Sequence, residues 1–439
     1  MILTIIIFIA TYVLIASEKI DKSLAALLGA GLVLFFHLAP YHELFAKVNF
    51  NVIFLLMGMM IAVNILATTG IFEWVAIVIA RWAKGNGMVI LIGFLLITAI
   101  ISAFLDNVTT IVLIAPITIL ITQILEIPTV PILILEAIFS NIGGTATMVG
   151  DPPNIIIGSE TALSFNDFIF HLSPVIIILS AILVLAFFYL FARMVEVAPE
   201  IKMRVMRAEP KLAIIEPARL KRALPLLGLI LLGFFCSRYI NVEPGIIALC
   251  GSLLMVIVCR LDMHQILLKV EWVTILFFIG LFILIGALEI NGVFNILGSY
   301  MLTLTQQNLL LTVLAVLWFS AIASAIVDNI PLVIAMIPVI KSLIPFFAMQ
   351  KGIVGYEELI RLQIEQPLFW ALALGACLGG NGTLIGASAN ILVAQIARRN
   401  KYKLSFWHFT KYGFPIMIVC LVICTLYLYL RYFALTGNS

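Results

Sequence analysis

An acidic turn inside a long apolar run occurs twice in this chain. Residues 102–116 read SAFLDNVTTIVLIAP, and residues 324–338, which lie 222 positions further along, read SAIVDNIPLVIAMIP. The shift places Asp106 on Asp328. A charged side chain in hydrocarbon costs about 2.5 kcal/mol or more even on the mildest scale, so charged residues at membrane depth usually mark ion pathways. The repeat predicts two similar halves with an ion site between them.

The composition assigns the chain to the membrane. Of 439 residues, 64% are hydrophobic and only 11% are charged, and the mean hydropathy is +1.22. These values exclude a soluble globule and indicate an all-α polytopic bundle in a lipid bilayer. The six cysteines form no CxxC pair and the five histidines have no zinc-binding spacing, so we expect no metal cofactor. Nothing in the sequence suggests a nucleic-acid partner.

The first half divides into spans and breaks. Apolar runs predict three crossings, a linking helix at the interface, a helical hairpin with its turn at Asp106, a half-helix, a glycine- and proline-rich break and a closing span. In chain order these are residues 2–16, 24–38, 50–67, 72–84, 88–125, 131–142, 143–154 and 174–191.

The second half repeats this pattern. The break GGTATMVGDPPN (143–154) is matched by GGNGTLIGASAN (379–390), at an offset that has grown to 236 because of a longer polar loop. The expected elements are residues 224–236, 246–258, 273–288, 294–304, 309–347, 379–390 and 414–430.

Residues 196–222 are the only long hydrophilic stretch and therefore divide the chain. The predicted units are 1–195, the first repeat; 196–222, a cytoplasmic linker; and 223–439, the second repeat. Each repeat has five transmembrane helices, a re-entrant hairpin and a broken helix, and because five is odd the second repeat is inverted. A cytoplasmic linker puts most of the 25 basic residues inside and both termini outside, as the positive-inside rule requires of a plasma-membrane protein.

The hairpin turns are the first candidate site. Aspartate also caps helices, so Asp106 and Asp328 have a purely structural interpretation, but serine or asparagine would cap without a charge. A carboxylate at this depth can exchange a proton for Na⁺. We therefore expect bound Na⁺ or H⁺ at Asp106, Asn107, Asp328 and Asn329.

The two breaks supply the other candidate groups. Irregular backbone at membrane depth survives only where protein or a wet cavity satisfies it, so the breaks should line the site. Asp151 has no counterpart, since Ala387 takes its place, and this asymmetry favours the first half as the main cation or proton site. Asn64 and Glu136 are interpreted as interhelical hydrogen-bonding groups. The predicted binding residues are Asp106, Asn107, Thr109, Thr145, Thr147, Asp151, Asn154, Asp328, Asn329, Asn381, Thr383, Ser388 and Asn390.

At these segments the chain resembles the ion transporter superfamily, which includes arsenite permeases, D-type Na⁺/H⁺ antiporters, the P protein and proteins with a citrate transporter-like domain. The matching blocks are SAFLDN with its following threonines, NIGG to GDPPN, and GGNGTLIGASAN (102–110, 141–154 and 379–390). The resemblance implies a homodimer that works by an elevator mechanism. Dicarboxylate carriers have a serine-asparagine-threonine motif at each tip, which this chain lacks.

The sequence therefore predicts a secondary active transporter for a small ion or weak acid, such as an arsenite-like oxyacid or another inorganic anion, coupled to H⁺ or Na⁺. Alternatives are a Na⁺/H⁺ antiporter, an anion (chloride) channel and a dicarboxylate or citrate carrier. Neither motif contains a lysine or arginine that would neutralise a multiply charged anion. An intramembrane aspartyl protease could use two aspartates as a dyad, but the GxGD signature is absent. We expect no enzyme activity.

Overall fold

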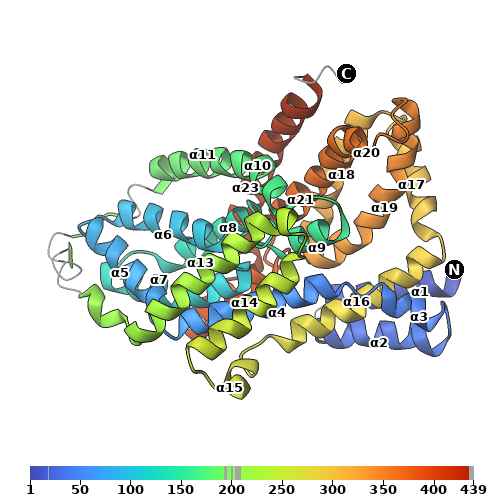
Figure 1. Ribbon diagram of the computed structural model, residues 1–439. Helices are drawn as coiled ribbons and strands as arrows, with labels where there is room; N and C mark the ends of the chain where they lie inside the picture. Colours follow the sequence, from blue (N-terminus) through green and yellow to red (C-terminus); the bar gives the residue numbers. More distant parts are fainter. Residues whose placement is uncertain (18, 192–194, 199–200, 203–208, 435–439) are drawn as a thin grey trace.

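The computed structural model describes residues 1–439 except 18, 192–194, 199–200, 203–208 and 435–439. All regular structure in the described residues is helical (Figure 1). Part of the predicted linker 196–222 lies outside the described residues. The helices of the first half are α1 (Ile2–Ser17), α2 (Lys22–Phe35), α3 (Tyr41–Ala46), α4 (Phe50–Ala67), α5 (Ile71–Trp82), α6 (Gly87–Ser102), α7 (Asn107–Leu125), α8 (Thr129–Gly144), α9 (Pro152–Glu160), α10 (Phe165–His171) and α11 (Ser173–Phe191).

The second half has a similar order of long and short helices, with one additional short helix at Glu357–Ile360 and a single long helix at its end. Its helices are α13 (Pro217–Ile240), α14 (Pro244–Val258), α15 (Met263–Leu267), α16 (Trp272–Ile290), α17 (Val293–Leu304), α18 (Leu309–Ile326), α19 (Asn329–Gln350), α20 (Glu357–Ile360), α21 (Gln366–Gly379), α22 (Ser388–Arg399) and α23 (Phe406–Tyr429). Short 3-10 turns cover Pro210–Ala213 and Gly380–Gly382, and π turns cover Arg361–Glu365 and Leu430–Ala434.

Eight helices of the described chain are long and apolar enough to cross a membrane, namely α4, α7, α11, α13, α16, α18, α19 and α23 with its π turn. Six further apolar helices are shorter. The prediction of an all-helical polytopic membrane protein is confirmed.

Two pairs of helices make equivalent close contacts. Helix α4 packs along α14, and α16 packs along α2. A Cβ atom on Gly58 of α4 would lie 2.5 Å from the backbone of Ala248, and one on Gly280 of α16 would lie 2.8 Å from the backbone of Ala26. Glycine allows helix backbones to approach this closely. The two contacts are related by the same 222-residue shift as the acidic turns.

The hairpins and broken helices pack together. Helix α8 lies against α6 and α7, and α21 lies against α18 and α19. In Figure 1, α6 and α7 lie at one end and α18 and α19 at the other, with α9 and α21 between them. Helices α2, α4, α14 and α16 run along one side of this group. The first arm of each hairpin starts at an asparagine cap, Asn86 or Asn308, whose side chain accepts backbone N–H groups.

Some helix boundaries differ from the sequence prediction. Helix α13 begins at Pro217, inside the predicted linker 196–222, because proline suits the first turn of a helix. Helix α23 begins at Phe406 rather than near residue 414, since the Ser405 side chain accepts the N–H of His408 and caps the helix. Both helices extend beyond their apolar segments, and therefore hydropathy alone misplaced their starts.

Candidate functional site

In each broken helix, an asparagine after the break hydrogen-bonds to carbonyl groups within the break. The side-chain amide of Asn154, in the first turn of α9, donates to the carbonyl oxygens of Thr145 (3.1 Å) and Thr147 (2.9 Å). Asn390 of α22 donates in the same way to Gly380 (2.8 Å) and Thr383 (2.9 Å). These bonds satisfy carbonyl groups that the interrupted helices leave open, which buried backbone requires.

Threonine side chains tie the breaks to the hairpin turns. The Thr147 hydroxyl donates to the Ala103 carbonyl, and the Thr383 hydroxyl donates to the Ala325 carbonyl at 2.5 Å. The Thr145 hydroxyl donates to the carbonyl of Asn141 at 2.7 Å. The predicted site threonines of the breaks thus use their protons to hold backbone.

Four buried asparagines connect the two halves. Asn107 donates to the side-chain oxygen of Asn141 at 3.2 Å. Asn141 in turn donates to the side-chain oxygens of Asn381 (2.9 Å) and Asn390 (3.1 Å). The structure therefore joins the first hairpin turn to the second break through Asn141, which was absent from the sequence-predicted site. Its position in the last turn of α8, just before Gly143 and Gly144, was a signal that sequence reasoning did not use.

The first hairpin turn has a carboxylate held by its own helix. Asp106 is the N-cap of α7, and it accepts the backbone N–H of Thr109 at 2.9 Å and the Thr109 hydroxyl at 2.5 Å. The structural role weighed for Asp106 is thus confirmed. Asp106 also lines the cavity described below.

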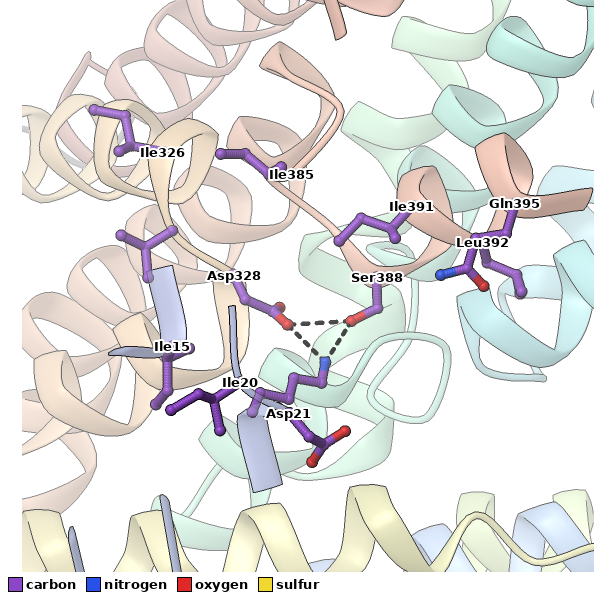
Figure 2. A pocket seen from close by; sticks show the side chains of 12 residues that line it. Ile15, Ile20, Asp21, Ile326, Asp328, Ile385, Ser388, Ile391, Leu392 and Gln395 are labelled. Carbon is purple, nitrogen blue, oxygen red and sulfur yellow. Dashed lines mark hydrogen bonds and ion pairs between the residues drawn. The ribbon is translucent and has the colours of Figure 1, made fainter. Parts of the chain in front are cut away.

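The second hairpin turn differs because its aspartate does not cap its helix. No cap bond reaches the side chain of Asp328, and Pro331 stands where the first half has Thr109. Proline has neither an N–H nor a hydroxyl to donate. The capping role weighed for Asp328 is therefore wrong. Asp328 is instead bonded to Lys22 (2.9 Å) and to the Ser388 hydroxyl (3.1 Å). Figure 2 shows Asp328 and Ser388 pointing toward each other.

Lys22 brings to the second hairpin turn a cationic side chain that neither motif contains. It is the first residue of α2, and α2 is 306 residues from Asp328 in sequence. Its role could not be seen in the motifs because it lies outside both.

Two neighbouring cavities open around these groups. A cavity of about 110 Å³ is lined by residues that include Lys22, Asp106, Asn107, Asp151, Glu271, Asn329 and Ser388. A second cavity, of about 320 Å³, is lined by Asp21, Lys22, Asp328, Ser388 and apolar side chains. Lys22 and Ser388 line both.

Glu271 was not among the predicted site residues. It precedes α16, and its side chain accepts the Thr274 hydroxyl at 3.1 Å. Burial, and then the nearby Asp106 carboxylate, raise the pKa of Glu271 above its ordinary value. A glutamate at the start of an apolar span resembles an ordinary cap, so no sequence pattern distinguished it.

Asp151 is the most buried carboxylate of the site. It is 1% exposed and precedes α9 without capping it through its side chain. One of its oxygens has no hydrogen-bond partner among the described residues, and the same holds for one oxygen of Asp328. Buried polar atoms normally have partners, so these two oxygens are exceptions.

Glu136 confirms its interpretation as an interhelical group. It is 0% exposed on α8 and accepts the hydroxyls of Thr118 (2.7 Å) and Thr98 (3.4 Å), which lie on the two arms of the first hairpin. Asn64 donates to the carbonyl oxygens of Met60 and Lys269. Neither lines the two cavities.

Helices of membrane-spanning length surround a group of carboxylates, amides and one lysine, an arrangement typical of a membrane transport protein. The family described as "Citrate transporter" matches residues 12–364, and the chain belongs to this family. It is a transporter and not an enzyme, which confirms the resemblance seen in the sequence.

Relatives extend over the whole chain. A Mycobacterium tuberculosis protein named "Uncharacterized transporter" is 41% identical over 98% of both chains. The "46 kDa membrane protein" of Mycobacterium leprae is 39% identical over 99% of this chain and all of that one. The human P protein is 32% identical over 97% of this chain and 59% of its own length.

Proposed function

We propose that this transporter is a secondary active carrier for a small ion or weak acid, coupled to H⁺ or Na⁺ at the carboxylates that line the two cavities. One observation carries the proposal: Asp151 and Asp328 each have a buried oxygen without a partner beside the two cavities. A proton or a small cation would supply the missing partner. Carboxylate and amide oxygens are suitable ligands for such ions.

The charge of the site narrows the substrate class. Five carboxylates line the two cavities, Asp106, Asp151 and Glu271 in one and Asp21 and Asp328 in the other, with Lys22 shared between them. This excess of negative charge favours a cation, or an uncharged weak acid such as an arsenite-like oxyacid. Although the family is described as a citrate transporter, a citrate trianion would need more positive charge than one lysine offers.

Na⁺/H⁺ exchange is the second candidate. It is favoured because the same carboxylates could bind either ion, and no separate site for an oxyacid is needed. An anion channel is disfavoured by the excess of carboxylates along the cavities.

An inverted pair of repeats that moves as an elevator explains how such a site changes sides. The matched contacts of Gly58 and Gly280, and of Asn154 and Asn390, support two halves of equivalent build. In this proposal α2, α4, α14 and α16 form a fixed scaffold, and the hairpins with the broken helices move past it. A homodimer in the plasma membrane, with the linker in the cytoplasm and both termini outside, completes the proposal.

Flux in proteoliposomes tests this function. Vesicles with imposed pH and Na⁺ gradients are assayed for movement of ²²Na⁺, protons, arsenite, chloride and citrate. We expect saturable flux that depends on H⁺ or Na⁺, and no flux above empty vesicles for the double variant D106N/D328N. E357Q, on the exposed start of α20, is the matched control and should transport like wild type.

Two results would contradict the proposal. Coupled flux at the wild-type rate in D106N/D328N would remove the carboxylates from the mechanism. A linear, non-saturating chloride current would indicate a channel.

A further inference from the structure

Lys22 fills one end of the site with a positive charge. Its ammonium group donates to the Asp328 carboxylate at 2.9 Å and to the Ser388 hydroxyl at 2.8 Å. The Ser388 hydroxyl lies 3.1 Å from the same carboxylate oxygen, so the three groups form a closed triangle (Figure 2). The ammonium also lies 5.2 Å from the centre of the Phe277 ring. These neighbours, a carboxylate oxygen and a hydroxyl, are the ligands that a small cation would take.

The sequence explains why Asp328 depends on this lysine. The equivalent carboxylate, Asp106, is satisfied by two bonds from Thr109, whereas Pro331 can give Asp328 neither. The lysine in turn has no counterpart, because the residue 222 positions after Lys22 is Pro244. The carboxylate of the second tip thus depends on a charged side chain from another helix, while that of the first tip does not.

The ion pair connects two groups of helices. Lys22 starts α2, which packs along α16, whereas Asp328 precedes the second arm of a hairpin and Ser388 starts α22. A movement of the hairpins and broken helices past α2 would break the bond to Lys22. In such a movement the ammonium would be part of the site in one position of the hairpins and absent from it in another.

A second carboxylate lies beside the lysine. Asp21 lines the same 320 Å³ cavity as Asp328. The Ser23 hydroxyl and the N–H groups of Ser23 and Leu24 hydrogen-bond to Asp21 and lower its pKa, so it stays ionised. The other charged groups that line the two cavities with Lys22 are Asp106, Asp151 and Glu271. A displaced ammonium would thus remain among negative groups.

We propose that Lys22 is a tethered cation that competes with the transported monovalent cation or proton for Asp328 and Ser388. The inference rests on the proposed function and names the competitor within its site. With Lys22 in place, the pair carries no net charge. An arriving Na⁺ or H⁺ takes the Asp328 carboxylate, the ammonium moves away with its own proton, and one positive charge is added to the site. The lysine occupies the site when no transported ion is bound. Ion binding therefore also releases Asp328 from α2.

The test removes the competitor and keeps the site. Binding of ²²Na⁺ to purified protein, and flux of ²²Na⁺ and protons in proteoliposomes, are measured for K22Q, K22R and wild type. Removing a state that blocks the site raises the apparent affinity by the reciprocal of the fraction of time the site was free. If the site is free for about one tenth of the time, K22Q should gain roughly tenfold in affinity for Na⁺ or for H⁺. K22R keeps the positive charge and should bind the ion like wild type.

A matched control uses another lysine. Lys47 forms an ion pair with Glu289 at 2.7 Å but contacts no predicted site residue, so K47Q should leave ion affinity unchanged. An unchanged affinity for both Na⁺ and H⁺ in K22Q overturns the inference, and so does an equal gain in K47Q. If K22Q fails to fold, P331T provides an independent test, since a restored threonine donor should weaken the hold of Lys22 and raise ion affinity as well.

The two proposals fail in different ways. If wild-type vesicles move none of the tested solutes, the proposed function fails. If wild type moves an ion and K22Q moves it with the same apparent affinity and the same coupling, only the role of Lys22 fails.

Discussion

The two hairpin tips begin with the same pair of residues, aspartate and asparagine, and yet their carboxylates are held in different ways. Asp106 is bonded to Thr109 of its own helix, whereas Asp328 is bonded to Lys22 of a distant helix. The difference follows from one position, which is threonine in the first half and Pro331 in the second. It indicates that a motif can be repeated in sequence while the partner of its carboxylate changes from a neutral donor to a charged side chain. The first tip is stabilised by hydrogen bonds within its own helix, whereas the second is stabilised by an ion pair with a distant helix.

The largest effect should come from exchanging each aspartate for asparagine. Asparagine caps a helix about as well as aspartate, so D106N keeps the fold of its tip. D328N loses the ion pair and leaves Lys22 without its partner. We expect D328N to reduce coupled flux by at least about tenfold, or about 1.4 kcal/mol, and D106N to reduce it less. Equal losses in the two variants would show that the tips act alike.

The next effect should come from giving the second tip the donor of the first. P331T restores an N–H and a hydroxyl three residues after Asp328, where Thr109 stands relative to Asp106. With the carboxylate bonded to its own helix, substitution of Lys22 should matter less. In flux assays, K22Q should change ion affinity less in the P331T background than in wild type. If K22Q changes ion affinity equally in both backgrounds, then Pro331 is not the reason that Asp328 depends on Lys22.

A smaller effect is expected at Glu136, a residue that differs between the two halves and lies outside the hairpin turns. The second half has Leu372 at the matching position, 236 residues later. E136L should leave the hydroxyls of Thr98 and Thr118 without their acceptor, at a cost of about 1–3 kcal/mol. E136Q keeps an acceptor and should lose less. Thermal unfolding in detergent measures both, and equal losses would show that the hydroxyl bonds contribute nothing.

The smallest effect concerns the pH dependence of stability at the first tip. Burial and the Asp106 charge raise the pKa of Glu271 above 4.5, so the folded protein holds this proton more tightly than the unfolded chain. Stability should therefore decrease as pH rises from below 4.5 through the raised value. Thermal unfolding across this pH range should show a shallower decrease in E271Q and D106N than in wild type. Identical slopes in all three proteins would contradict this prediction.

Much of this architecture could be predicted because its signals are local. The acidic turns, the glycine-rich breaks and the spans between them each lie in one short segment. The structure places six of the thirteen predicted site residues on the walls of two neighbouring cavities, namely Asp106, Asn107, Asp151, Asp328, Asn329 and Ser388. The halves, the cytoplasmic linker and the binding roles of individual residues remain predictions.

What could not be predicted depends on distant partners. Lys22 reaches Asp328 across 306 positions, and from sequence a lysine before an apolar run indicates only orientation in the membrane. Asn141 and Glu271 were missed for a related reason, since each looks like an ordinary helix-end residue. One local clue was overlooked: Pro331 cannot provide the donors that Thr109 gives, so Asp328 needed a partner from elsewhere.

Asn141 has a consequence for stoichiometry. Its amide bonds to Asn381 and Asn390 place the polar groups of both halves in a single buried network. Two independent half-sites could fill one at a time and pass a variable number of ions per cycle. A carrier whose halves share this network would load as one unit and move a fixed number of ions at each turnover.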